Sequence, residues 1–260
     1  MPKFNDLDLQ NWKDIDLDMN SLWVIPERKK GGKHDNFYHG NFIPQIPEHF
    51  IKRYTKKGGW VLDPFLGSAT TAIECEELGR NIIGIDIQKE LVDRAKELID
   101  SKKIHAHFGV GDSSSKETRE DIEKIFKHRK IDGVDLALLH PPYADIIKFT
   151  DKKEDLSNSG SIENFLLDFG KVLKNTYKLL KEKGYMVIVM GDKYQNSEWI
   201  PLGFMCMTEA QKVGFKLKGV IVKNMEGNRG KSGNGAIWKY RALNSDYYLF
   251  KHEYILVFKK

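Results

Sequence analysis

The chain has 260 residues, of which 40% are hydrophobic and 30% charged, an ordinary balance for one globular domain with a buried core. It shows neither an apolar run of membrane-spanning length nor a signal-peptide pattern at its acidic start, so we expect a cytoplasmic protein with no membrane partner. The net charge of +5 excludes little, since many proteins that bind no nucleic acid are this basic.

The first 40 residues lack hydrophobic periodicity, and we expect residues 1–40 to form an N-terminal arm before a main domain at 41–260. Basic residues gather in a glycine-bearing stretch late in this arm, Lys29 and Lys30 among them. A short basic loop of this kind suits contact with a phosphate backbone. A solvated surface loop without a ligand is the alternative.

From residue 58 the sequence alternates short β-branched runs with amphipathic helical segments. Strands are expected at 58–65, 81–87, 103–112, 134–140, 185–192, 215–224 and 247–260, and helices at 69–80, 88–103, 113–130, 163–182 and after Pro201. This order predicts an α/β fold with a doubly wound, mostly parallel, seven-stranded Rossmann-like sheet. The last two strands have no long helix between them, so we expect an antiparallel C-terminal hairpin. Two insertions, 144–161 and 224–246, interrupt the pattern.

Acidic residues stand at the ends of the first three strands. Asp63 is followed by a small-residue turn through Gly67, which lets the backbone approach a ligand closely at the start of a helix. Asp86 follows the second strand, where it can accept hydrogen bonds from both hydroxyls of a ribose, and Asp112 follows the third, within reach of an adenine amino group. The set predicts a site for an adenosine-bearing ligand. The alternative is that these aspartates only cap the helices that follow.

The fourth strand ends in His140-Pro141-Pro142-Tyr143. Two prolines fix the backbone and remove two N–H donors, so carbonyl oxygens can face a site without a partner in the chain. Acceptors at His140 and at the Pro141 carbonyl would hold the hydrogens of an aromatic amino group, and the Tyr143 ring can stack on a planar base. The amino nitrogen is a poor nucleophile because its lone pair is delocalised into the ring. Held in this way, it can attack a sulfonium methyl group in line, helped by orientation and electrostatics. A proline turn with a surface tyrosine is the alternative.

Together these residues resemble the DNA amino-methyltransferases, which have the class I methyltransferase fold and use S-adenosylmethionine. Their pattern is a D-P-F-x-G-S-G-T-T turn, an acidic residue after the second strand, and [DNS]-P-P-[YFW] after the fourth. The resemblance covers most of the chain, and the motif order is similar to the γ arrangement of the family. It implies that S-adenosylmethionine is bound by Phe42, Pro44, Asp63, Pro64, Phe65, Gly67, Ser68, Thr70, Asp86, Ile87 and Asp112, and that His140, Pro141, Pro142 and Tyr143 act on a base flipped out of the duplex without a metal.

Two positions depart from the family pattern. Ala69 stands where the family has glycine, and His140 replaces Asp, Asn or Ser. A neutral imidazole can accept a hydrogen bond and a protonated one cannot, so we expect His140 to work neutral and activity to fall as the pH drops through its pKa. Asp or Asn is the expected residue in adenine-N6 enzymes, and its absence favours cytosine N4.

The resemblance implies double-stranded DNA as the substrate, with only small elements to recognise it: the N-terminal arm and the two insertions. Arginine and asparagine can read base edges, and aromatic rings can fill the gap left by a flipped base, although a mobile hairpin loop is the alternative for 224–246. A restriction endonuclease partner, if one exists, would be a separate protein, because the chain carries no nuclease constellation. DNA contacts are predicted for Lys29, Lys30, Lys223, Asn228, Arg229, Lys231, Trp238, Lys239 and Arg241.

Two other functions stay open from the sequence. Related sheets with N-P-P-Y use the same chemistry on RNA or on a protein glutamine. The second alternative is a DNA-binding subunit that is catalytically inactive because His140 and Ala69 replace the residues of the family pattern. Cys75, Cys206 and the histidines share no metal-type spacing, so we expect structural thiols and no metal centre.

Overall fold

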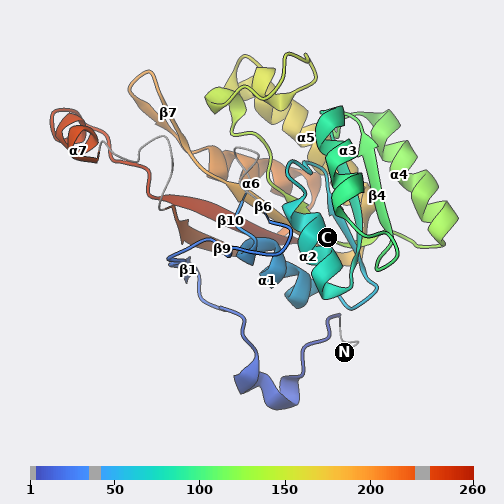
Figure 1. Ribbon diagram of the computed structural model, residues 1–260. Coiled ribbons are helices and arrows are strands. Elements are labelled where there is room, and N and C mark those ends of the chain that lie inside the picture. Colours follow the sequence, from blue (N-terminus) through green and yellow to red (C-terminus); the bar gives the residue numbers. More distant parts are fainter. Residues whose placement is uncertain (1–3, 35–41, 226–234) are drawn as a thin grey trace.

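A computed structural model describes residues 4–34, 42–225 and 235–260 (Figure 1). A central sheet carries helices on both faces, and a two-stranded hairpin stands apart from it. The strands are β1 Leu22–Trp23, β2 Trp60–Asp63, β3 Asn81–Asp86, β4 Ala106–Val110, β5 Val134–Leu139, β6 Leu180–Met190, β7 Lys193–Gln195, β8 Glu198–Ile200, β9 Lys216–Asn224 and β10 His252–Lys259. The α-helices are α1 Gln45–Tyr54, α2 Thr70–Leu78, α3 Lys89–Leu98, α4 Lys116–Arg129, α5 Ile162–Leu179, α6 Leu202–Val213 and α7 Gly235–Leu243, and the 3-10 helices are η1 Leu9–Asp14, η2 Ala144–Ile146 and η3 Leu156–Asn158.

The main sheet has eight strands in the order β1-β9-β10-β6-β5-β2-β3-β4. All neighbours are parallel except that β10 runs antiparallel to both β6 and β9. The predicted fold is therefore confirmed, and β1 is a short eighth strand at the edge. The chain runs from β2 outward to β4 and then returns to β5 on the other side of β2. Strand order reverses there, so the carboxyl ends of β2 and β5 border the crevice where such sheets bind ligands.

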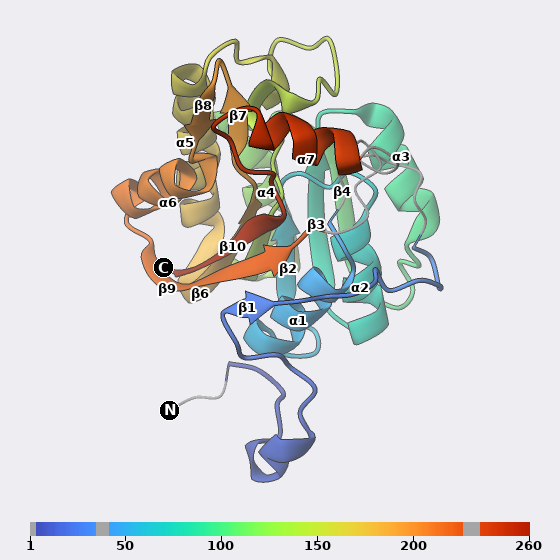
Figure 2. The same ribbon diagram turned by 90° about the vertical axis from the view of Figure 1, so that its left-hand side faces the viewer.

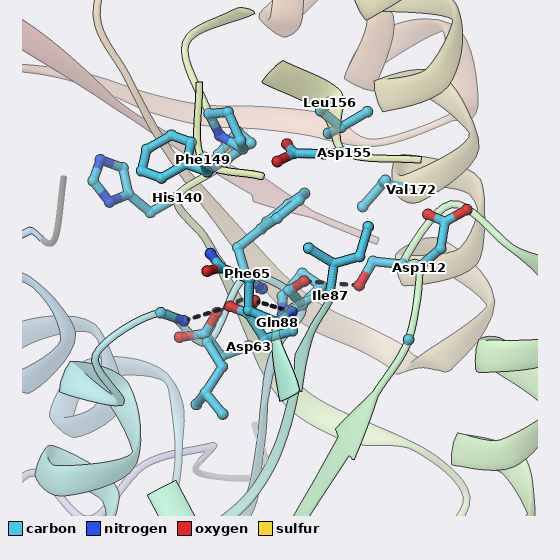
Figure 3. Close-up of a pocket in the computed structure, with 18 of the residues that line it drawn as sticks. Asp63, Phe65, Ile87, Gln88, Asp112, His140, Phe149, Asp155, Leu156 and Val172 are labelled. Atoms are coloured by element: carbon cyan, nitrogen blue, oxygen red, sulfur yellow. Dashed lines mark hydrogen bonds between the residues drawn. The ribbon is translucent and has the colours of Figure 1, made fainter. Parts of the chain in front are cut away.

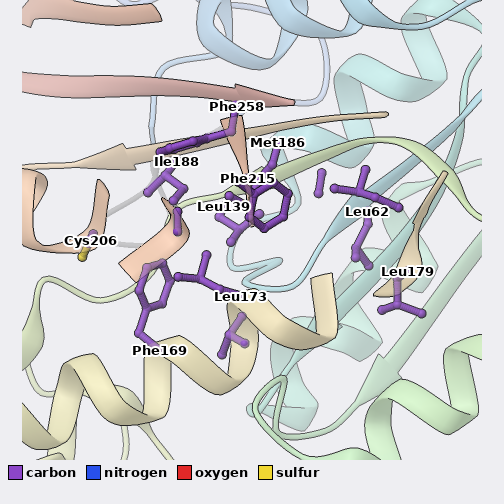
Figure 4. Close-up of a cluster of buried hydrophobic side chains, with 14 of the residues drawn as sticks. Leu62, Leu139, Phe169, Leu173, Leu179, Met186, Ile188, Cys206, Phe215 and Phe258 are labelled. Carbon is purple, nitrogen blue, oxygen red and sulfur yellow. The ribbon is translucent and has the colours of Figure 1, made fainter. Parts of the chain in front are cut away.

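The two faces of the sheet have separate cores. Helices α1, α2 and α3 cover one face, and α4, α5 and α6 cover the other, as the two views of the ribbon show (Figures 1 and 2). On the α5 side, Phe169 and Leu173 pack against Leu139 and Phe258 from the strands (Figure 4). Burying each of these side chains contributes about 2 kcal/mol, so this core holds β5, which carries the catalytic motif predicted from the sequence, in a fixed position.

The strand β6 begins earlier than the sequence predicted. Helix α5 was expected to reach residue 182, but it ends at Leu179. Leu180 is buried and pairs with Val134 of β5, so sheet pairing overrides the helix propensity of the lysines and glutamate that follow.

Two elements near the end of the chain were not predicted. The hairpin β7–β8 turns through Asn196 and Ser197, both at positive φ, as in the two-residue turns that fit the twist of a hairpin. Helix α7 occupies the second half of the insertion 224–246, and residues 226–234 lie outside the described residues. Both elements stand at the same end of the sheet (Figure 1).

Part of the N-terminal arm docks on the main domain. Leu22 and Trp23 pair with Val222 and Lys223 of β9, and the Trp23 ring stacks on Phe50 of α1 with 5.7 Å between the ring centroids. Only 3% of Trp23 is exposed, so this end of the arm belongs to the core. No helix in the described part of the chain is long and apolar enough to cross a membrane.

Candidate active site

A pocket lies at the carboxyl ends of β2, β3, β4 and β5 (Figure 3). The space between its lining residues, counted together with the solvent at its open mouth, is about 850 Å³. The turn around Gly67 and the pair Pro141–Pro142 line this same pocket, although 74 residues separate Gly67 from Pro141 in the sequence. The lining residues are Phe42, Asp63, Pro64, Phe65, Leu66, Gly67, Ser68, Thr70, Asp86, Ile87, Gln88, Gly111, Asp112, Ser113, His140, Pro141, Pro142, Phe149, Glu154, Asp155, Leu156 and Val172.

The turn after β2 is held from two sides. The Gly67 amide donates a hydrogen bond to Asp86 Oδ2 at 2.8 Å, and the Phe65 amide donates to Asp63 Oδ1 at 3.0 Å. Gly67 and Ala69 both have positive φ, at 49° and 64°, a conformation that glycine adopts freely and alanine adopts with strain. Asp63 is buried at the base of the turn, and burial raises its pKa to about 7.

Asp86 and Asp112 face the pocket from the ends of β3 and β4. Burial raises the pKa of Asp86, and its second oxygen, Oδ1, accepts from the Gln88 amide at 2.9 Å. Asp112 accepts from the amide and the hydroxyl of Ser114, both at 2.8 Å. The helices that follow begin after Ala69, Gln88 and Ser115, so the alternative that Asp63, Asp86 and Asp112 are helix N-caps is wrong.

The pocket is acidic. Five acidic side chains line it, Asp63, Asp86, Asp112, Glu154 and Asp155, and among the described residues that form its wall there is no lysine or arginine. A polyphosphate such as that of ATP or NAD would be repelled by this lining, whereas a cation would be attracted. These acidic side chains therefore suit an adenosine ligand that carries a positive charge, such as S-adenosylmethionine with its sulfonium group.

His140 and Asp112 lie at opposite ends of the pocket (Figure 3). The His140 ring meets Phe42 edge to face, with 5.0 Å between centroids. Burial lowers the pKa of His140 to about 4, with the charge of Lys223 acting in the same direction and that of Glu253 opposing it. The imidazole is thus neutral near pH 7, the form that the sequence analysis expected to be active.

Tyr143 is not placed where the sequence analysis expected it. It is absent from the pocket lining, and its ring packs so closely on Gly191 that a Cβ there would come within 2.8 Å of Tyr143 Cε2. Its hydroxyl donates to Glu253 Oε2 at 3.1 Å and lies 3.0 Å from His140 Nε2. Among the described residues, the phenyl rings that line the pocket are those of Phe42, Phe65 and Phe149.

The sequence analysis missed one wall of the pocket. Phe149, Glu154, Asp155 and Leu156 come from the insertion 144–161, which we had assigned to DNA recognition. Lys152 of this insertion donates through Nζ to the carbonyl of Ile87, which ties the insertion to the residue that follows β3. The sequence of this insertion has no hydrophobic periodicity that would predict its structure. Only the acidic pair at 154–155 could have suggested a polar site. Gln88, Gly111, Ser113, Leu66 and Val172 were also missed, whereas Pro44, which we had predicted, does not line the pocket.

The residues predicted to contact DNA are scattered. Lys223 is buried and its ammonium lies 2.9 Å from Glu253 Oε1, so the prediction of a phosphate contact at this position is not supported. Lys29 lies 3.1 Å from Glu48 and ties the arm to α1, and Lys30 is exposed beside Glu27. Trp238, Lys239 and Arg241 lie on α7, whereas Asn228, Arg229 and Lys231 lie outside the described residues.

Cys75 and Cys206 are both buried and unpaired. Within residues 4–34, 42–225 and 235–260, no group of three or more His, Cys, Asp or Glu side chains is arranged to hold a metal ion.

Comparison with known proteins gives one family. A model of the N6/N4 methylases, described as DNA methylase, matches residues 5–97 and 134–260. The Type II methyltransferase M.MjaII of Methanocaldococcus jannaschii is 43% identical over 74 residues, which are 27% of this chain and 14% of that protein. The Type II methyltransferase M2.DpnII of Streptococcus pneumoniae is 35% identical over 88 residues, which are 32% of this chain and 31% of that protein. Each match thus spans less than a third of the relative's length.

The fold has a solved counterpart. TrmN from Thermus thermophilus matches 85% of this chain and 50% of its own, with a TM-score of 0.52 and 16% sequence identity. At that identity the likeness concerns the fold alone.

Proposed function

Because the chain belongs to the N6/N4 family of DNA methylases, we propose that it transfers a methyl group from S-adenosylmethionine to the exocyclic amino group of a base in double-stranded DNA. S-adenosylmethionine is the cofactor of this family, and the sheet is that of a class I methyltransferase. One observation carries the proposal: the cofactor turn at Gly67 and the motif at Pro141–Pro142 open onto one pocket. A donor and an acceptor bound at these two stretches would meet inside it.

The adenosine half of the cofactor would bind at the Asp112 end of the pocket. Asp86 would accept from the ribose hydroxyls, since each of its oxygens keeps a lone pair besides its bond to the Gly67 or Gln88 amide. Phe65 and Gly67 would hold the methionine half. The acidic lining supports this placement, because the cofactor carries a sulfonium cation. When bound, the cofactor supplies an electrophilic methyl group.

The His140 end of the pocket would receive the base. An exocyclic amino nitrogen is a weak nucleophile because its lone pair is delocalised into the ring. His140 and the Pro141 carbonyl would accept its two hydrogens and favour tetrahedral geometry. The nitrogen lone pair would then form the new bond to the methyl carbon as the carbon–sulfur bond breaks toward sulfur, and the nitrogen would release one proton to solvent. A base inside a duplex cannot reach this position, so we propose that it is flipped out of the stack.

Cytosine N4 is the amino group that we favour over adenine N6. The support is His140, which stands where adenine-N6 enzymes are expected to carry Asp or Asn. Phe42 and Phe149 line the pocket together with His140, and either ring could stack on a flipped base in place of Tyr143.

The surface proposed to bind DNA lies at the pocket edge of the sheet. Strands β6 and β9 run parallel to β5, so the hairpin β7–β8 and helix α7, which follow them, emerge on the same edge as the pocket (Figure 2). On α7 the Arg241 guanidinium lies 5.1 Å from the centroid of the Trp238 ring, with Lys239 exposed beside it. Cations interleaved with aromatic rings are typical of nucleic-acid surfaces.

A cytoplasmic location and a separate restriction endonuclease partner belong to the same proposal. The relatives from Methanocaldococcus jannaschii and Streptococcus pneumoniae are named Type II methyltransferases, which supports such a partner. The buried thiols Cys75 and Cys206 suit a reducing compartment.

The proposal is tested by incubating the chain with methyl-labelled S-adenosylmethionine and separate pools of DNA, RNA and protein. We expect label in DNA alone, and much less of it with Asp86→Ala at the same cofactor concentration. Label in RNA or protein would favour the alternative acceptors. Binding of both cofactor and DNA without transfer would identify a catalytically inactive subunit.

A further inference from the structure

Four side chains form a chain of hydrogen bonds behind the pocket. His140 Nε2 lies 3.0 Å from the Tyr143 hydroxyl, which donates to Glu253 Oε2 at 3.1 Å. Lys223 Nζ donates to the other oxygen of Glu253 at 2.9 Å. These residues come from the loop after β5, from β10 and from β9, yet only His140 lines the pocket.

The directions of these bonds determine which nitrogen of His140 carries the proton. An ionised carboxylate accepts only, so the single hydroxyl proton of Tyr143 points to Glu253. The tyrosine oxygen can then only accept from His140, which requires a proton on Nε2. The neutral imidazole has one N–H, so Nδ1 is left bare with a lone pair.

We propose that Tyr143 and Glu253 are positioning residues that hold His140 in its Nε2–H tautomer, so that Nδ1 accepts a hydrogen bond from the substrate amino group. The inference rests on the proposed function for the identity of that donor. In the opposite tautomer, the Nδ1–H group would face an N–H group of the substrate. Two donors would then oppose each other, and no hydrogen bond could form. The chain of hydrogen bonds thereby lets a histidine replace the Asp, Asn or Ser of the family pattern.

The surroundings keep this chain of bonds in one arrangement. Glu253 is buried, and Lys223 balances its charge. Close contact with Gly191 fixes the Tyr143 ring. Among the described residues, no group donates to His140 Nδ1, and the charged groups that act on the imidazole are Glu253 of β10 and Lys223 of β9. Lys223 therefore contributes to the site from within the protein rather than through a phosphate.

The chain offers a matched control. His252 Nε2 lies 3.0 Å from the Tyr254 hydroxyl, which donates to Asp192 Oδ2 at 3.3 Å. This is a second histidine–tyrosine–carboxylate chain, and none of its three residues lines the pocket. Tyr254→Phe thus removes a hydroxyl of the same kind close to the site without touching His140.

The first experiment measures the tautomer itself. The full chain is labelled with ¹⁵N at histidine, and the His140 signals are assigned by their loss in His140→Asn. Near pH 7 we expect a protonated Nε2 and a bare Nδ1, a state that Tyr143→Phe abolishes or mixes and Tyr254→Phe leaves unchanged. A protonated Nδ1 in the unmodified chain would overturn the inference and leave the proposed function standing, because the measurement needs no methyl transfer.

The second experiment measures methyl transfer to DNA. We expect Tyr143→Phe and Glu253→Gln to lower kcat about tenfold to hundredfold, with the KM for S-adenosylmethionine unchanged. In a His140→Asn background the same changes should have little further effect, since the asparagine oxygen accepts in either case. Full additivity of the two losses would overturn the inference. Absence of transfer in the unmodified chain, together with the expected tautomer, would instead count against the proposed function.

Discussion

The amide nitrogen of Gly67 and the carboxylate of Asp86 are joined by a hydrogen bond of 2.8 Å, which links the turn after β2 to the end of β3. One residue thus both shapes the turn and faces the pocket. Asp86 keeps its carboxylate largely out of solvent, and its other oxygen binds the Gln88 amide. The geometry of the turn and the charge at this end of the pocket both depend on this side chain, and so would its contact with the proposed cofactor.

Replacing Asp86 by alanine is expected to weaken S-adenosylmethionine binding about tenfold to hundredfold, because the ribose hydroxyls lose a charged acceptor and the Gly67 turn loosens. Isothermal titration of the purified chain measures this affinity. Asp93→Ala on α3, an exposed aspartate that pairs with Lys89, serves as the control and should bind like the unmodified chain. Equal affinity for the Asp86 and Asp93 variants would contradict the assignment.

The pH dependence of activity should carry the signature of His140. Its pKa is lowered to about 4, so the imidazole is neutral and able to accept above that pH and becomes a cation below it. Activity should therefore fall as the pH drops through about 4, and His140→Asn should lack this limb. Asp63, whose pKa is raised to about 7, titrates in both proteins and cancels in the comparison. Identical acid limbs would show that His140 is not the group responsible.

The lowered pKa of His140 also predicts that the stability of the fold depends on pH. The pKa of His140 is about 4 in the folded chain against 6.5 for an ordinary histidine, so the unfolded chain binds more protons between these values. Stability is thus fully present above about pH 6.5 and is lost as the pH falls toward 4, by at most about 3 kcal/mol since part of the ring reaches the pocket. Urea unfolding at several pH values should show a shallower loss for His140→Asn. A parallel pH dependence in the two proteins would refute this.

Ala69 should tolerate glycine better than its neighbour Ala72 does. Ala69 is buried at φ 64°, where relief of left-handed strain offsets the flexibility of glycine, whereas Ala72 is buried inside α2. We expect Ala69→Gly to change the free energy of unfolding by less than about 1 kcal/mol and Ala72→Gly to lower it by about 2 kcal/mol. Denaturant titration compares the two, and equal losses would mean that Ala69 is not strained.

Lys223 should matter for folding and Lys239 should not. Lys223→Met leaves Glu253 buried without its partner and is expected to lower the free energy of unfolding by about 3 kcal/mol. Lys239→Met removes an exposed charge and should stay within about 0.5 kcal/mol. The double change Lys223→Met with Glu253→Leu should recover part of the loss in thermal or urea unfolding. If Lys223→Met left the free energy of unfolding unchanged, the ion pair between Lys223 and Glu253 would not stabilise the fold, contrary to this prediction.

The sheet and the bottom of the pocket were predictable because their signals are local. Buried parallel strands such as β3 and β5 are short apolar runs in the sequence. Asp63 and Asp86 are the last residues of β2 and β3, and Asp112 lies two residues beyond the end of β4. Once the runs are assigned to one parallel sheet, these carboxylates must meet at its carboxyl edge. The position of the pocket at this edge follows from the same rule.

The remaining parts depend on contacts that are distant in the sequence. The Tyr143 hydroxyl finds its partner Glu253 110 residues later, so nothing near the motif indicates that the ring turns away from the pocket. Lys223 stands between Val222 and Asn224 near the end of β9, and nothing in this local sequence indicates that the flanking strands β1 and β10 and the ion pair with Glu253 bury it. The wall formed by Phe149 and Asp155 comes from a loop without periodicity, whose position is set by its own side-chain hydrogen bonds.

The most direct test uses S-adenosylmethionine that carries a trideuterated methyl group. Duplex DNA is incubated with the chain and digested to nucleosides, which are then resolved by mass spectrometry. The account predicts trideuteromethyl on the N4 of deoxycytidine, strongly reduced with Asp86→Ala at the same cofactor concentration. Label on the N6 of deoxyadenosine would keep the amino-methyl transfer and reject the choice of base. Label on a ring carbon, or on no nucleoside while the cofactor is bound, would contradict the claim that the pocket brings donor and amino group together.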